Sequence, residues 1–175
     1  MANAKRIAIL ATNGFEQSEL EVPRDKLREA GFQVDVVSPE SGKIRGWKGK
    51  DWGQEVDVDV ALSKAKPEDY QALVLPGGVI NPDLLRVNKD AVKFIRAFDA
   101  DGKPLAAICH GPWLLAEAGA AKGRALTSYK SIRTDMENAG ARWQDAEVVV
   151  DEHLITSRTP DDLPAFVDAV KKALA

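Results

Sequence analysis

Cysteine and histidine are the scarcest reactive residues of this chain. Its 175 residues contain one cysteine, Cys109, and two histidines. A lone cysteine excludes an internal disulfide, a Cys-x-x-Cys redox pair and a zinc site built from cysteines. His153 has no second imidazole at ligand spacing, so we expect it on the surface and expect no metal. Any chemistry at Cys109 must therefore proceed without a second thiol in the same chain.

The chain also lacks long apolar runs and any excess of positive charge. The apolar run from Ile7 to Ala11 is too short for the core of a signal peptide or for a membrane span, so we expect a cytoplasmic protein with no membrane partner. The formal net charge of -3 provides no basic surface for a phosphate backbone, so nucleic acid is not an expected partner.

Known cofactor motifs are missing as well. The glycine pair Gly77 and Gly78 lies outside any Gly-x-Gly-x-x-Gly pattern, and no Gly-Lys-Ser/Thr loop occurs. We therefore expect no cofactor. With 45% hydrophobic and 29% charged residues, the composition is typical of one globular domain, which we expect to span residues 1–175.

Short apolar runs rich in β-branched residues alternate with segments of helical spacing. The runs expected to form buried strands are Arg6–Ala11, Val34–Val37, Ala72–Leu75, Leu105–Ile108 and Glu147–Val150. Strands that are apolar on both faces and separated by helices predict a doubly wound α/β fold, with a mainly parallel sheet covered on two sides. The glycine-rich stretch from Lys43 to Val60 predicts a hairpin or an irregular excursion.

The segment Ala107-Ile108-Cys109-His110-Gly111 has the layout of a nucleophile elbow, in which small residues flank the reactive one at a sharp strand-to-helix turn. Amides at the start of the following helix would favour the thiolate, so we expect a lowered pKa for Cys109. His110 either takes part in proton transfer or points into a polar interface, because adjacency alone does not fix its direction.

Two neighbouring segments are expected to complete the site. Gly77 and Gly78 follow a strand and let backbone N–H groups approach a ligand oxygen, as an oxyanion hole requires. Glu16, Glu19 and Glu21 open the first helix, and only one of them need face the site. A glutamate in contact with Cys109 would keep its proton and donate a hydrogen bond to the sulfur.

Four motifs in register now carry a resemblance to a known family. They are Gly14–Pro23, Leu75–Gly78, Ala107–Pro112 and Ile155–Arg158. Together they resemble the PfpI branch of the superfamily that contains the parkinsonism-associated deglycase, which is also related to class I glutamine amidotransferase domains.

The resemblance implies a flavodoxin-like fold, a homodimer or larger homo-oligomer, and a nucleophilic cysteine at Cys109 with His110 beside it. It also implies that Glu19, four residues before Pro23, contacts the sulfur. Members of the family have been described as cofactor-free glyoxalases, as deglycases of dicarbonyl adducts, as intracellular peptidases and as stress-response proteins.

One position departs from the family pattern. Peptidase-like members carry a glutamate shortly after the Pro-Gly-Gly turn, which orients the histidine of a neighbouring subunit, whereas this chain has the shorter Asp83. We expect Asp83 to act on His110 across a subunit interface, with helix capping as its alternative role. Tyr129 falls where some relatives carry a histidine near the thiol, and it is expected to line the pocket.

The preferred interpretation is a cofactor-free enzyme acting on reactive carbonyls or glycated substrates. The Cys109 thiolate adds to the carbon, the amides of Gly78 and His110 hold the oxyanion, and Glu19 or His110 moves protons. A cysteine peptidase or amidohydrolase is the alternative, and so is a redox sensor or chaperone whose Cys109 is oxidised without turnover. In all three interpretations, the elbow, including Gly111, forms the centre of the site.

Overall fold

A seven-stranded sheet forms the centre of the computed structural model, which describes residues 3–175. Its strand order is β11-β12-β8-β7-β1-β3-β6, and only the edge strand β11 runs antiparallel to its neighbour. The strands are β1 (Arg6–Leu10), β3 (Gln33–Ser38), β6 (Val60–Ala61), β7 (Ala72–Leu75), β8 (Leu105–Ile108), β11 (Val149–Asp151) and β12 (Leu154–Ser157). This architecture confirms the predicted doubly wound, mainly parallel sheet.

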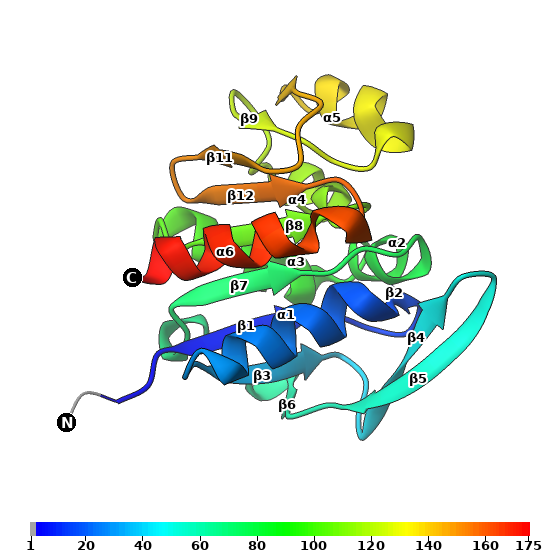
Figure 1. The fold of residues 1–175 in the computed structure, drawn as a ribbon, viewed down its shortest axis with the longest axis vertical. Coiled ribbons are helices and arrows are strands. Elements are labelled where there is room, and N and C mark those ends of the chain that lie inside the picture. Colours follow the sequence, from blue (N-terminus) through cyan, green and yellow to red (C-terminus); the bar gives the residue numbers. More distant parts are fainter. Residues whose placement is uncertain (1–2) are drawn as a thin grey trace.

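Helices cover both faces of the sheet (Figure 1). The helices are α1 (Gln17–Glu29), α2 (Ile80–Leu85), α3 (Lys89–Ala100), α4 (Pro112–Ala118), α5 (Arg133–Asn138) and α6 (Leu163–Leu174). α1 and α6 pack on one face of the central strands, and α3 and α4 pack on the other. Because both faces are covered, β7 and β8 are buried at every residue, which is why their sequences are continuously apolar.

The predicted hairpin between Lys43 and Val60 is confirmed. β4 (Lys43–Lys48) and β5 (Asp51–Asp57) pair antiparallel, and β4 also pairs with the short β2 (Phe15–Glu16). The N–H of Gly14 donates to Arg45 at 2.8 Å, which ties the hairpin to the loop after β1. The hairpin therefore lies at the end of the sheet where β1 finishes (Figure 1).

The last strands differ from the sequence prediction. The expected strand Glu147–Val150 is the antiparallel edge strand β11, shifted to Val149–Asp151, and β12 was not predicted. The two strands are joined by a tight turn in which Glu152 has a φ of 54°. The polar residues around this turn mark it in the sequence, but the short strand that follows the turn was not predicted.

His153 was expected on the surface, and it lies there partly buried. Its Nε2 lies 2.8 Å from a carboxylate oxygen of Asp99, which also pairs with Arg124. Three residues of this cluster come from different elements, so spacing along the sequence could not reveal it.

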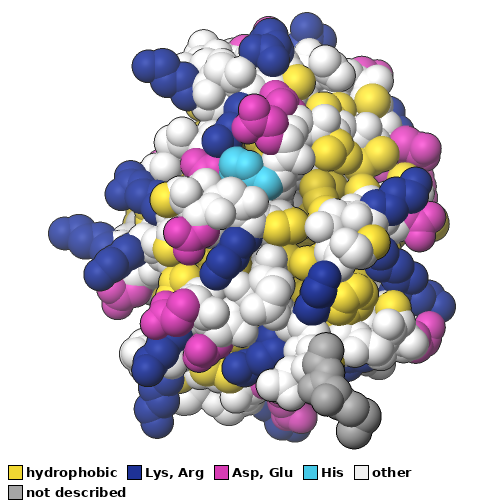
Figure 2. All heavy atoms as spheres, turned by 90° about the vertical axis from the view of Figure 1, so that its left-hand side faces the viewer, with side chains coloured by type: hydrophobic (Ala, Val, Ile, Leu, Met, Phe, Trp, Pro, Cys, Tyr) yellow, Lys and Arg dark blue, Asp and Glu magenta, His cyan; other side chains and the backbone are white. Residues whose placement is uncertain are grey.

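The end of the molecule where the strands begin has an ordinary mixed surface. Figure 2 shows basic and acidic side chains interspersed there, beside a hydrophobic area. None of the helices within residues 3–175 is both long and apolar enough to cross a bilayer.

A further small sheet, β9 (Ala125–Leu126) with β10 (Arg142–Trp143), carries the segment that leads to Tyr129.

Candidate active site

Cys109 occupies a strained turn between β8 and α4. Its φ is 64°, a left-handed conformation that residues with a Cβ seldom adopt. The backbone N–H of Cys109 donates to Ser157 at 3.0 Å, and its carbonyl accepts from the N–H of Tyr129 at 2.8 Å. A side chain at Gly111 would place Cβ 2.5 Å from the carbonyl oxygen of Leu75. The predicted sharp turn from strand to helix is therefore confirmed, and it is held from both sides.

His110 points its imidazole at the sulfur rather than away from it. The Nδ1 atom lies 3.2 Å from Sγ of Cys109, and Nε2 lies 3.3 Å from Oγ of Ser131. The ring stacks on Tyr129 and meets Trp113 edge-on. Burial lowers the pKa of His110, so the imidazole is neutral at neutral pH and can accept a proton. This geometry decides between the two directions that adjacency left open.

Glu19 is the glutamate of α1 that faces the thiol. Its side chain is fully buried, and Oε1 accepts a hydrogen bond from the N–H of Gly77 at 2.9 Å. Oε2 is buried without a nitrogen or oxygen partner among the described residues, and the carboxyl interacts with Cys109. Burial, with the nearby charge of Glu16, raises the pKa of Glu19 well above its usual range, so Glu19 holds a proton at neutral pH.

The expected low pKa of Cys109 is a prediction that the structure corrects. Burial raises the pKa of the Cys109 thiol, and the charge of Glu19 raises it further, whereas the N–H groups of Gly78 and His110 act in the opposite direction. The helix amides on which the prediction depended are not free, because Pro112 has none and Gly111 donates to Ile108 at 2.8 Å. Ionisation of either group therefore opposes ionisation of the other, so Cys109 and Glu19 are not both charged.

Only part of the predicted oxyanion hole is free to bind an oxygen. The N–H groups of Gly78 and His110 are directed at the sulfur. The N–H of Gly77 is taken by Glu19, so its predicted donor role is wrong, and the N–H of Gly111 is taken by Ile108. Both positions require glycine because a Cβ atom would clash with neighbouring atoms. At Gly77, for example, a Cβ would lie 2.6 Å from Oε1 of Glu19.

A cavity of about 630 Å³ opens onto Cys109. The residues that sequence analysis placed there, and that line it, are Glu19, Gly78, Cys109, His110 and Tyr129. The lining also includes Trp47 of the hairpin, Ser131 and Pro160, which sequence analysis missed. No motif marked these three residues. The alternation of glycine and tryptophan in the hairpin was the one signal, and it gave no direction for the Trp47 side chain.

Asp83 does not reach this cavity within the chain. It lies in α2, its side chain is exposed, and no hydrogen bond joins it to His110 in the part of the chain that the structure describes. The N-terminal cap of α2 is Val79, and the N–H of Asp83 already donates to Val79, so the alternative capping role is wrong. Its action on a neighbouring subunit stays a prediction.

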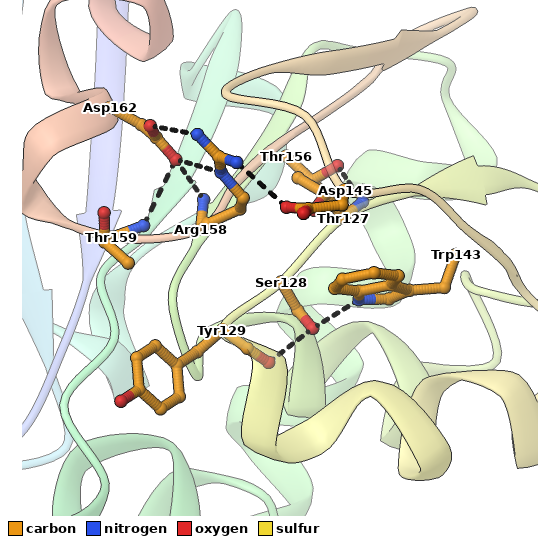
Figure 3. Close-up of polar contacts among 9 residues, drawn as sticks. All are labelled: Thr127, Ser128, Tyr129, Trp143, Asp145, Thr156, Arg158, Thr159 and Asp162. Carbon is orange, nitrogen blue, oxygen red and sulfur yellow. Dashed lines mark hydrogen bonds and ion pairs between the residues drawn. The ribbon is translucent and has the colours of Figure 1, made fainter.

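Tyr129 is fixed by a small network beside the cavity (Figure 3). Oγ of Ser128 donates to the carbonyl of Tyr129 and accepts from Nε1 of Trp143, both at 2.9 Å.

Arg158 of the fourth motif pairs with Asp162 and Asp145. Its guanidinium is thus engaged in holding the turn before α6, and it does not line the cavity.

Three reactive side chains meet at the cavity: the thiol of Cys109, the carboxyl of Glu19 and the imidazole of His110. Each can exchange a proton, and the thiol can also form a covalent bond. Within residues 3–175 the structure brings no three histidine, cysteine, aspartate or glutamate side chains together as metal ligands.

Comparisons with known proteins agree with the fold and cover almost the whole chain. The profile of the DJ-1/PfpI family matches residues 5–173. The chain is 49% identical over 163 residues to general stress protein 18 of Bacillus subtilis, covering 93% of each protein. It is 47% identical over 165 residues to protein/nucleic acid deglycase 2 of Escherichia coli, covering 93% of this chain and 94% of that protein.

Among solved structures, the chain superposes with a TM-score of 0.92 and 37% identity on a two-domain protein of Anabaena variabilis that contains DJ-1/ThiJ/PfpI-like and ferritin-like domains. The match covers 97% of this chain and 48% of that protein, so the chain spans about half of its length.

Proposed function

Because the chain belongs to the DJ-1/PfpI family, we propose that it is a cofactor-free deglycase in which Cys109 attacks adducts of small dicarbonyls on amines and guanidines, as part of protection against carbonyl stress. The observation that carries the proposal is the cavity in which one thiol lies against a proton-bearing carboxyl and a neutral imidazole. The names of the two relatives, a deglycase and a general stress protein, support it.

The first step starts from the thiolate form of Cys109 beside the protonated carboxyl of Glu19. Sγ bonds to the carbinol carbon of the adduct while the bond from that carbon to the substrate nitrogen breaks. The departing nitrogen takes its proton from Glu19. The products are a free amine or guanidine and a hemithioacetal on Cys109, and the negative charge now resides on Glu19.

His110 supplies the base for the second step. Its neutral ring moves the proton of the carbinol carbon to the adjacent carbonyl carbon, while the N–H groups of Gly78 and His110 hold the oxygen on which charge develops. The hemithioacetal becomes the thioester of a 2-hydroxy acid, which water hydrolyses to the acid and the thiol. Adduct and water thus give amine and 2-hydroxy acid, and no external oxidant is consumed.

A cysteine peptidase is a second candidate, and the contact between His110 and Cys109 at 3.2 Å favours it. A peptidase also needs the imidazole to protonate a poor leaving group, which a carboxylate on the far side of the ring would assist. The described chain places Ser131, and not an acid, at Nε2 of His110. Asp83 of a second subunit is the residue we propose for that position.

Self-association is part of the proposal, because the segment around Asp83 is unusually apolar for a surface. Val79, Leu84 and Val87 are 55%, 49% and 79% exposed, and they are three of the five exposed large hydrophobic residues of residues 3–175. Covering them with a second copy of the chain would bring Asp83 near another active site. We also propose that the protein acts in the cytoplasm, where a lone thiol stays reduced.

The test must separate attack on the adduct from removal of free dicarbonyl, because the two are in equilibrium. Purified protein and Cys109→Ser are incubated with the methylglyoxal adduct of N-acetylarginine methylamide, and released guanidine and lactate are followed by NMR. A deglycase releases guanidine faster than the adduct dissociates spontaneously, and only with Cys109 present. Release at the spontaneous rate would identify a glyoxalase acting on free methylglyoxal, and cleavage of casein alone would identify the peptidase.

A further inference from the structure

The cavity beside Cys109 is lined by acidic side chains without cationic ones among the described residues. Its lining includes the carboxyl groups of Glu16 and Glu19, and no lysine or arginine within residues 3–175 contributes to it. Glu19 holds a proton, so Glu16 is the anion of the cavity. The Glu16 side chain is half-buried and forms no ion pair within the described part of the chain. Burial raises the pKa of Glu16, so its ionised form would be stabilised by a cation bound in the cavity.

Trp47 stands beside this carboxylate. Glu16 of β2 and Trp47 of β4 are register partners, and both side chains line the cavity. The indole of Trp47 is fixed, because its Nε1 donates to Gly49 at 3.0 Å and its ring meets Trp52 edge-on at 5.4 Å. An immobilised indole next to a carboxylate matches a cation that is planar, since one group binds its edge and the other its face.

We propose that Glu16 and Trp47 form a cation subsite that selects guanidinium-bearing substrates, namely dicarbonyl adducts of arginine side chains. The inference rests on the proposed deglycase function and names its substrate class. A guanidinium donates two parallel hydrogen bonds to a carboxylate while its plane stacks on tryptophan, whereas an ammonium has neither the planar face nor the paired donors, and an anion is repelled. Adducts of neutral groups such as thiols gain nothing from the subsite.

The subsite also links binding to reactivity. The charge of Glu16 opposes ionisation of Cys109. A guanidinium bound to Glu16 neutralises that charge and removes the opposition. The correct substrate therefore favours the thiolate that attacks it, and the empty site keeps its nucleophile largely protonated.

A titration of the only cysteine tests the subsite without turnover. The thiolate absorbance near 240 nm is measured against pH for wild type, Glu16→Gln and the control Glu21→Gln, with and without N-acetylarginine methylamide. Glu21 lies on α1 but does not line the cavity. We expect the ligand to raise the thiolate-to-thiol ratio of wild type and Glu21→Gln roughly tenfold at fixed pH. Glu16→Gln should show a higher ratio without ligand and no response to it.

Kinetics provide the second readout. Wild type and Glu16→Gln are compared on methylglyoxal adducts of N-acetylarginine methylamide and N-acetylcysteine methylamide. We expect Glu16→Gln to lower kcat/KM for the arginine adduct roughly tenfold or more, mainly through KM, and to leave the cysteine adduct unchanged or faster. Equal effects on both adducts, or an unchanged thiolate ratio on adding the guanidinium, would overturn the subsite. If wild type converts neither adduct, the proposed function fails, while the titration still decides whether the cation binds.

Discussion

At the scale of single residues, the site depends on two acidic groups that oppose each other's ionisation. The sequence predicted the partners correctly, since the motifs placed Cys109, His110 and Glu19 together. It did not predict the direction of the Cys109 pKa, because that depends on burial and on which amides are already bonded. Likewise, the glycine signals at Gly77 and Gly111 indicated a close approach but not whether an N–H remained free.

The raised pKa of Glu19 makes a prediction about stability. In a Cys109→Ala background the carboxyl titrates without the thiol, and burial still raises its pKa. In the unfolded chain a glutamate ionises near pH 4.3. Above that pH the folded state holds a proton that the unfolded state has lost, so the stability present at low pH is lost as pH rises towards the folded pKa. The expected slope is about 1.4 kcal/mol per pH unit.

Urea unfolding between pH 5 and pH 7.5 checks this expectation. The double variant Cys109→Ala/Glu19→Gln has no proton to lose at this position. Its free energy of unfolding should therefore increase relative to that of Cys109→Ala as pH rises. The difference cancels the contributions of all other titrating groups that the two variants share. If the two stability curves run parallel, Glu19 ionises like an exposed glutamate and cannot act as the proton donor.

At the scale of elements, the loops that leave the carboxyl ends of β1, β7 and β8 form the site. Sequence alternation predicted these strands, because buried parallel strands are apolar along their whole length. It missed the four-residue strand β12, although Ser157 of that strand holds the elbow. It also could not show that Trp47 faces the cavity, since that depends on how the hairpin folds back onto β2.

The loops pack closely at Gly78. A matched pair of glycine-to-alanine variants tests whether this close packing positions the N–H of Gly78. Gly78 has a φ of 76°, and a Cβ there would lie 2.4 Å from the carbonyl oxygen of Gly14. Gly42 has nearly the same φ, 77°, with open space around its Cβ position. Both changes to alanine incur the left-handed penalty of about 1 kcal/mol. Only Gly78→Ala should also displace the donor N–H and abolish most of the activity.

Thermal unfolding and adduct turnover of the two variants measure the two effects separately. We expect similar small losses of stability from the shared φ, with an additional loss for Gly78→Ala from the backbone clash. Full activity of Gly78→Ala would mean that its N–H does not hold the developing charge.

At the scale of the whole molecule, the sheet gathers one site from segments that lie far apart in the chain. The cavity is lined by residues from Gly14 to Pro160, all of them beyond the carboxyl ends of the parallel strands. The sequence predicted this edge, because topology alone directs parallel strands to it. It could not show what covers α2, where exposed apolar side chains surround Asp83. A contact between two chains leaves no periodic signal in either one.

The contact between two chains at α2 can be tested by mixing inactive variants. If Asp83 acts on His110 of a neighbouring chain, Cys109→Ser and Asp83→Ala are each impaired as pure oligomers, and a mixture recovers activity. A chain with Cys109→Ser still supplies Asp83 to the intact thiol of its Asp83→Ala partner, so a randomly mixed dimer restores about a quarter of the sites. The double variant Cys109→Ser/Asp83→Ala, mixed with Asp83→Ala in place of Cys109→Ser, provides the control, because neither chain then supplies the carboxylate. Fully active Asp83→Ala oligomers, or a mixture no more active than its components, would assign Asp83 to the surface of α2 alone.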